Sequence, residues 1–68
     1  MVGKRICEYL ADHGIKKTFL AEKAQIPFPI LSAMLSGSRK IEVMEYYRIC
    51  QALQVDLLTF LVDEESEI

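Results

Sequence analysis

The sequence predicts an all-α fold, a compact domain of five short helices. Apolar residues recur at steps of three and four along most of the chain, which places them on one face of a helix. Glycine and proline divide this pattern into segments of two to three turns, at Gly14, Pro27 and Gly37. With 68 residues, of which 51% are hydrophobic and 26% charged, the chain is long enough for one small globular domain.

The first two helices are expected over residues 2–13 and 17–24. Gly14 ends the first helix, and apolar residues recur at helical spacing in both. Two cations, Lys16 and Lys17, stand at the start of the second helix, where they oppose the helix dipole. A phosphate group bound nearby could offset that local cost.

The third helix is expected from Phe28 to the residue before Gly37. A proline disfavours helix at the residue before it, so Pro27 should keep Ile26 extended. Pro29 is tolerated because it falls in the first turn of a helix. The second and third helices, joined by this short break, form a predicted helix-turn-helix.

The fourth helix is expected from about Glu42 to Leu53. Its apolar stripe is made by Val43, Tyr46 or Tyr47, Cys50 and Leu53. A final helix is expected from Leu57 to about Val62, with Asp56 as its N-cap. Its apolar residues should face the core or a second subunit; these are Leu57, Phe60 and Leu61.

Charge is distributed unevenly along the chain. Residues 1–41 carry seven basic and three acidic residues, whereas residues 42–68 carry one basic and seven acidic residues, which gives the net charge of −2. The uneven distribution indicates either a polarised molecule or an ordinary solvated surface. The predicted organisation is a single helix-turn-helix domain over residues 1–62 and a short acidic tail over residues 63–68.

Several classes of protein are disfavoured by the sequence. No apolar run is long enough to span a membrane, and charged residues interrupt any leader-like segment near the start. Cys7 and Cys50 do not form a CxxC pair, so reduced core thiols and a cytoplasmic location are expected. No catalytic triad spacing, phosphate-binding glycine loop or metal-ligand cluster is found. The prediction is therefore a non-enzyme without a cofactor or a metal.

One ordered set of residues is similar to a known family. The set comprises LAEKA at 20–24, Ile26, Leu31-Ser32, Gly37, ICQAL at 49–53 and Val55. Together these residues resemble the lambda-repressor-like, Cro-type (XRE) helix-turn-helix DNA-binding domain over roughly residues 4–61. The resemblance implies a sequence-specific transcriptional regulator of Cro or repressor type, from a bacterium, phage or mobile element. Its partners would be double-stranded DNA and a second copy of the chain, because such domains usually bind palindromic sites as dimers.

The resemblance also implies which residues meet DNA. The third helix would enter the major groove, with base-facing positions at Phe28, Pro29, Ser32, Ala33 and Ser36. Backbone phosphates would be contacted by Lys17, Ser38, Arg39 and Lys40. The family favours glycine in the turn after the second helix and at the end of the fourth. Here these positions hold Gln25 and Gln54, and the first of them often requires a positive φ.

The base-facing set departs from what base readout favours. It contains no Arg, Lys, Asn or Gln, the side chains that distinguish base edges through paired hydrogen bonds. Phe28, Pro29 and Ala33 could contact thymine methyl groups, or form an apolar patch for another protein. The alternative function is therefore a protein-interaction module, an antirepressor or adaptor, on the same fold. A third possibility is that Phe28 packs inward and the helix is scaffold. The sequence leaves the exposure of Phe19 and Phe28 open.

Overall fold

The computed structural model describes residues 2–61. It contains four α-helices and one 3-10 helix: α1 (Val2–His13), α2 (Lys17–Ala24), α3 (Phe28–Ser36), α4 (Val43–Leu53) and η1 (Leu57–Phe60). The described residues include no strand. The predicted all-α fold is confirmed, and so are the predicted bounds of the first three helices. No helix within residues 2–61 is long and apolar enough to cross a membrane.

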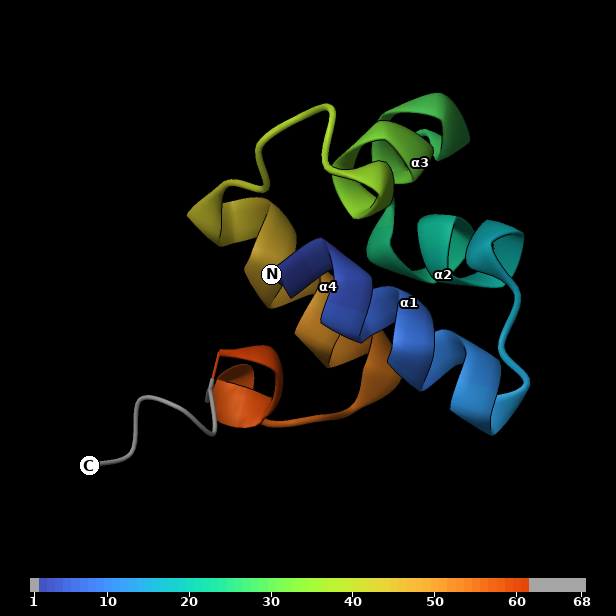
Figure 1. Ribbon diagram of the computed structural model, residues 1–68, viewed down its shortest axis with the longest axis vertical. Helices are drawn as coiled ribbons and strands as arrows, with labels where there is room; N and C mark the ends of the chain where they lie inside the picture. The colour runs from blue at the N-terminus through green and yellow to red at the C-terminus, as the bar shows by residue number, and fades with distance from the viewer. Residues whose placement is uncertain (1, 62–68) are drawn as a thin grey trace.

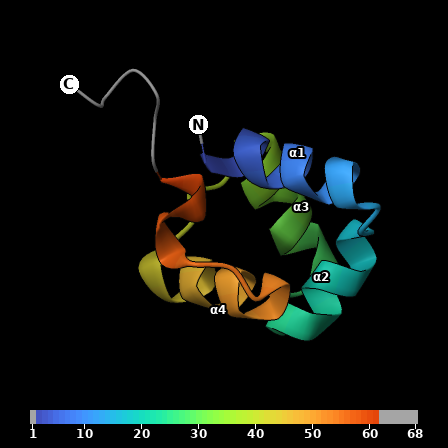
Figure 2. The ribbon, with the colours of Figure 1, turned by 90° about the horizontal axis from the view of Figure 1, so that it is seen from below.

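The helices pack as two pairs around a shared centre. α1 contacts α3, α2 contacts both α3 and α4, and η1 closes against α1 and α4. Figure 1 shows α3 at the top of the molecule and η1 at the bottom, and Figure 2 shows α3 between α1 and the pair α2 and α4. The helix-turn-helix α2–α3 is therefore packed against α1 through α3 and against α4 through α2.

The core is wholly apolar and draws on every element. No polar or charged residue is buried among the described residues. The buried residues are Ile6, Leu10, Leu20, Ala21, Ala24, Ile26, Leu31, Met34, Leu35, Ile49, Cys50 and Phe60. Ile26 lies in the turn between α2 and α3, so the turn itself is anchored in the core and fixes how the two helices meet. Both cysteines are free thiols, with Cys50 buried and Cys7 half-buried.

The contact between α1 and α3 depends on a glycine. A Cβ atom at Gly3 would lie 2.9 Å from the backbone oxygens of both Met34 and Leu35. Because these are backbone atoms, they cannot move aside as a flexible side chain would. Gly3 therefore allows the start of α1 to approach the end of α3 closely, which helps to fix the orientation of α3.

Each α-helix ends at a residue with positive φ. These residues are Gly14 (φ 66°), Gln25 (φ 60°), Gly37 (φ 92°) and Gln54 (φ 58°). At Gln25 the backbone N–H points back to the carbonyls of Ala21 and Glu22, which closes the end of α2. The expected positive φ at Gln25 is confirmed. A side chain in the left-handed region is strained relative to glycine, by about 1–2 kcal/mol.

The C-terminal element differs from the prediction. Residues 57–60 form a 3-10 turn and not a fifth α-helix, and Asp56 occupies the N-cap position without a side-chain capping bond. So short a segment gains too few hydrogen bonds to offset helix nucleation, so tertiary contacts set its form. Phe60 is buried edge-on to the rings of Tyr9 and Tyr46, and the Tyr46 hydroxyl donates to the Leu57 carbonyl. Val62 and the predicted acidic tail lie outside the described residues.

The predicted bounds of the fourth helix are confirmed, but the burial of its first turn differs from the prediction. α4 begins at Val43 with Glu42 as its N-cap, and Val43 is 82% exposed and is not part of an internal stripe. The buried residues of α4 are Ile49 and Cys50, in its second half. Val43 and Met44 in the first turn of α4 are both exposed and line a groove on the surface.

Candidate nucleic-acid interface

α3 has one buried face and one open face. Leu31, Met34 and Leu35 lie in the core. On the open face, Phe28 is 43% exposed and Pro29 is exposed, in the first turn of the helix. The remaining base-facing candidates are Ser32 and Ala33, which are half-buried, and Ser36, which is exposed at the last turn. Phe28 thus does not pack inward, and the first turn of α3 carries accessible residues of the predicted site.

Local sequence fixes the start of α3. Pro27 adopts φ −55° and ψ 138°, and its carbonyl accepts the N–H groups of Ile30 and Leu31 at 3.0 and 2.9 Å. Pro29 follows in the first turn, where it has no N–H to leave unpaired and its ring restricts φ. The two prolines hold Phe28 between them in a restricted backbone. The exposed first turn is therefore preorganised before any ligand arrives.

The serines at the end of α3 bond to one another. The Ser36 hydroxyl donates to the Ala33 carbonyl at 3.0 Å, the Ser38 hydroxyl donates to the same carbonyl at 3.3 Å, and the two Oγ atoms lie 3.1 Å apart. A hydroxyl has a single hydrogen to donate. A contact from Ser38 to a phosphate, which only accepts, therefore requires its hydroxyl to rotate away from Ala33. Ser32 has no side-chain hydrogen bond within the described residues.

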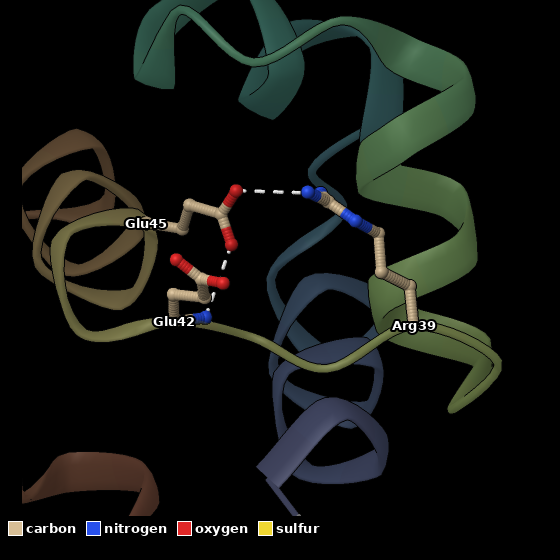
Figure 3. A network of polar contacts seen from close by, with 3 residues as sticks. All are labelled: Arg39, Glu42 and Glu45. Atoms are coloured by element: carbon tan, nitrogen blue, oxygen red, sulfur yellow. Dashed lines mark hydrogen bonds and ion pairs between the residues drawn. The ribbon is translucent and has the colours of Figure 1, made fainter.

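The loop between α3 and α4 brings together a cation and an acid that the sequence did not pair. Arg39 Nη1 lies 3.3 Å from Glu45 Oε2, while Glu45 Oε1 accepts the N–H of Glu42 at 3.0 Å (Figure 3). Lys40 is exposed beside Arg39. The site residue missed by sequence reasoning is Glu45, six positions after Arg39. Its pairing with Arg39 depends on the path of the loop, and no spacing in the sequence indicates that pairing.

The first turn of α2 supplies the other cations. Lys17 is the first residue of α2 and is exposed, and Lys16 occupies the N-cap position. Lys16 makes no side-chain capping bond, so no side chain of the cap satisfies the amides of the first turn. Free amides and exposed cations at a helix N-terminus suit an anionic group such as a phosphate. The predicted phosphate-contacting residue Lys17 is thus accessible.

Two grooves lie away from α3. An apolar groove of about 580 Å³ is lined by Val2, Ile41, Val43, Met44, Tyr46, Tyr47, Leu57 and Leu61. A polar groove at the C-terminal ends of α2 and α4 includes Lys23, Arg48 and Phe19, whose ring is 49% exposed and lies 5.6 Å from the Lys23 ammonium. Sequence reasoning missed the apolar groove, because it assigned Val43 to the apolar stripe of the fourth helix and left open whether Leu57 faces the core or a second subunit.

Comparison with known families agrees with this geometry. The sequence matches the Cro/C1-type HTH DNA-binding domain over residues 5–66, nearly the whole chain. Comparisons with curated proteins and with solved structures gave no match. The matched family consists of DNA-binding domains and is not an enzyme family. Within residues 2–61, no group of three or more His, Cys, Asp and Glu side chains is placed to hold a metal ion. The chain belongs to the family of Cro/C1-type helix-turn-helix DNA-binding domains.

Proposed function

We propose that this DNA-binding regulator is a sequence-specific transcriptional regulator of Cro or repressor type that occupies an operator with α3 in the major groove. The observation that carries the proposal is the exposed, proline-held first turn of α3 within a Cro/C1-type helix-turn-helix. In helix-turn-helix proteins the N-terminal residues of the second helix meet the base edges. The base-facing residues would be Phe28, Pro29, Ser32, Ala33 and Ser36.

The phosphate contacts would come from both sides of α3. Lys17 stands at the start of α2, and Arg39 and Lys40 stand in the loop after α3. Cations placed on either side of a groove-binding helix hold it in register on the sugar-phosphate backbone. Ser38 would join them once its hydroxyl turns from Ala33. The excess of basic residues in the segment 1–41 supports the same assignment.

We further propose a homodimer, assembled through the apolar groove that α4, Leu57 and Leu61 line together with Val2 and Ile41. Among residues 2–61, five of the eight exposed large hydrophobic residues belong to α4 or η1, namely Val43, Met44, Tyr47, Leu57 and Leu58, and a sixth, Leu61, directly follows η1. A contiguous apolar patch is uncommon on a monomeric protein and marks an interaction surface. A second copy would cover the groove symmetrically and leave both α3 helices free for two half-sites. A regulator of this kind would act in the cytoplasm of a bacterial cell, on bacterial, phage or mobile-element DNA, without a cofactor.

Competition between duplex and single-stranded DNA tests the proposed function. A labelled random-sequence duplex is bound at low ionic strength, and unlabelled duplex or either single strand is added. The proposal predicts displacement by duplex at much lower concentration than by single strands, because α3 fits a groove. Equal displacement would point instead to stacking on the exposed Tyr47 ring, and absence of duplex binding would contradict the proposal.

A protein-interaction module, an antirepressor or adaptor, is the second candidate. The exposure of Phe28 beside Pro29 favours it, because exposed apolar residues on one helix turn suit a protein partner. If the purified protein binds no duplex at low salt, and alanine at Phe28 abolishes capture of a specific protein, this candidate replaces the first.

A further inference from the structure

α3 lacks the side chains that read base edges by paired hydrogen bonds. Its nine residues, FPILSAMLS, include no Arg, Lys, Asn, Gln, Asp or Glu. Discrimination among base pairs in the major groove normally rests on such groups, which match the donor and acceptor pattern of one base. A different feature of the base pairs must therefore carry sequence information to this helix.

The hydroxyl groups on α3 are poor substitutes for side chains that make paired hydrogen bonds to base edges. Ser36 donates its hydrogen to the Ala33 carbonyl, and Ser38 donates to the same oxygen from the adjoining loop. This leaves Ser32, which is half-buried and one turn beyond Phe28. A single serine can hydrogen-bond to several bases, so it discriminates weakly.

The accessible surface of α3 is instead apolar at the end that reaches base edges. Phe28 is 43% exposed, Pro29 is exposed, and the methyl group of Ala33 is half-buried one turn further along. The apolar feature in the major groove is the C5-methyl group of thymine, which Ala and Phe side chains contact. The match to a DNA-binding family, together with the exposed cations Lys17 at the start of α2 and Arg39 and Lys40 in the loop after α3, makes duplex DNA the occupant.

We propose that α3 selects its site through pyrimidine C5-methyl groups, with Phe28 as the main contact. Thymine is the ordinary ligand. 5-Methylcytosine carries a methyl group at the same ring position, so it is accepted where unmodified cytosine is not. This inference rests on the proposed function, because it requires α3 to lie in the major groove of duplex DNA.

The test replaces thymine by uracil, which removes the methyl group and leaves the base-pairing atoms unchanged. A preferred duplex is first selected from a random-sequence pool, and thymine-containing positions should be enriched. Uracil is then placed at each enriched position in turn. The affinity should fall about fourfold for each contacted methyl group removed. At the same position, cytosine should weaken binding and 5-methylcytosine should restore most of the loss.

Three variants separate the role of Phe28 from general effects. Phe28→Ala should bring the thymine-to-uracil affinity ratio close to one, while Phe28→Leu, which keeps an apolar side chain, should retain most of the ratio. Phe19→Ala is the matched control, because Phe19 is also an exposed phenylalanine but lies in the polar groove of α2 and α4. It should leave the ratio unchanged. Circular dichroism confirms that each variant keeps its helix content.

The outcomes of the test distinguish failure of this inference from failure of the proposed function on which it rests. Duplex binding that depends on salt but is equal for thymine and uracil overturns methyl recognition and leaves DNA binding in place. A pool of bound duplexes without thymine enrichment would likewise overturn methyl recognition and leave DNA binding in place. Failure to bind any duplex at low salt would contradict both the proposed function and this inference.

Discussion

Arg39 Nη1 lies 3.3 Å from Glu45 Oε2, and the other oxygen of that carboxylate accepts the N–H of Glu42 at the start of α4. Glu45 thus caps α4 and holds the loop cation at the same time (Figure 3). Arg39 is exposed, so the pair contributes at most about 1 kcal/mol to stability. Arg39 can therefore leave Glu45 for a phosphate at small cost, with Glu45 as its competitor.

Neutralising Glu45 should strengthen DNA binding. In Glu45→Gln the amide oxygen can still accept the Glu42 N–H, but the negative charge beside Arg39 is removed. We expect duplex affinity to rise roughly two- to fivefold with little change in unfolding temperature. Fluorescence anisotropy measures the affinity. Glu8→Gln, an equal change of net charge on α1, is the control, and an equal rise in both variants would show a general charge effect and not release of Arg39.

Glycine at the strained helix ends should stabilise the fold. Gln25 and Gln54 have φ values of 60° and 58°, which glycine adopts without strain. The relief of about 1–2 kcal/mol is partly offset by the greater freedom of glycine in the unfolded chain, so each substitution should add about 0.5–1 kcal/mol. Urea unfolding measures the change. The reverse substitution, Gly14→Ala at φ 66° with open space around it, should destabilise the protein, and gains at neither glutamine would contradict the strain argument.

The parts of the fold that sequence predicts are those set by neighbouring residues. Gly14, Pro27 and Gly37 end or start helices through their own backbone restrictions, so these boundaries could be placed without coordinates. The form of residues 57–60 could not, because Phe60 and Tyr46 fix it through contacts with other elements. A segment of that length has no strong local preference.

The candidate site divides in the same way. The positions of Phe28 and Lys17 on their helices follow from the helix-turn-helix pattern, and the structure finds both exposed. The ion pair of Arg39 with Glu45 depends on how the loop returns to α4, and the apolar groove depends on how α4, η1 and the start of α1 come together. Exposure of Val43 cannot be read from periodicity, since the same spacing describes a buried stripe.

Tyr46 should make stability depend on alkaline pH. Burial raises the pKa of Tyr46 from 10.0 to about 12, and Cys50 beside it adds to the rise. Between pH 10 and 12 the folded protein keeps a proton that the unfolded chain loses. The contribution of Tyr46 to the free energy of unfolding is therefore fully present below pH 10 and is lost as the pH rises through this range.

Replacing Tyr46 tests this assignment. Tyr46→Phe removes the hydroxyl that bonds to the Leu57 carbonyl, which should cost about 1 kcal/mol at neutral pH. The variant should lose less stability than wild type between pH 10 and 12, so the difference between them narrows there. Urea unfolding at several pH values provides the comparison. Tyr47→Phe, on the exposed face of α4, should follow wild type; a constant gap for Tyr46→Phe would argue against the assignment.

A charge in the apolar groove should separate the proposed dimer. Val43 is 82% exposed, so Val43→Glu should leave the fold of one subunit unchanged while placing a carboxylate against the partner. We expect the dimer dissociation constant to rise at least roughly tenfold, by sedimentation equilibrium. Phe19→Glu introduces the same charge at an exposed residue outside the groove and should not affect assembly. Wild-type protein that stays monomeric across the micromolar range would refute the dimer.

The salt dependence of duplex binding tests the central claim most directly. Wild type is compared with Arg39→Ala/Lys40→Ala, and with Lys23→Ala/Arg48→Ala, which removes two cations from the polar groove at the other end of α4. If the loop cations hold phosphates, the log–log slope should fall by about two units in the first variant and remain near wild type in the second. Equal slopes in all three proteins, or no duplex binding at low salt, would contradict the account.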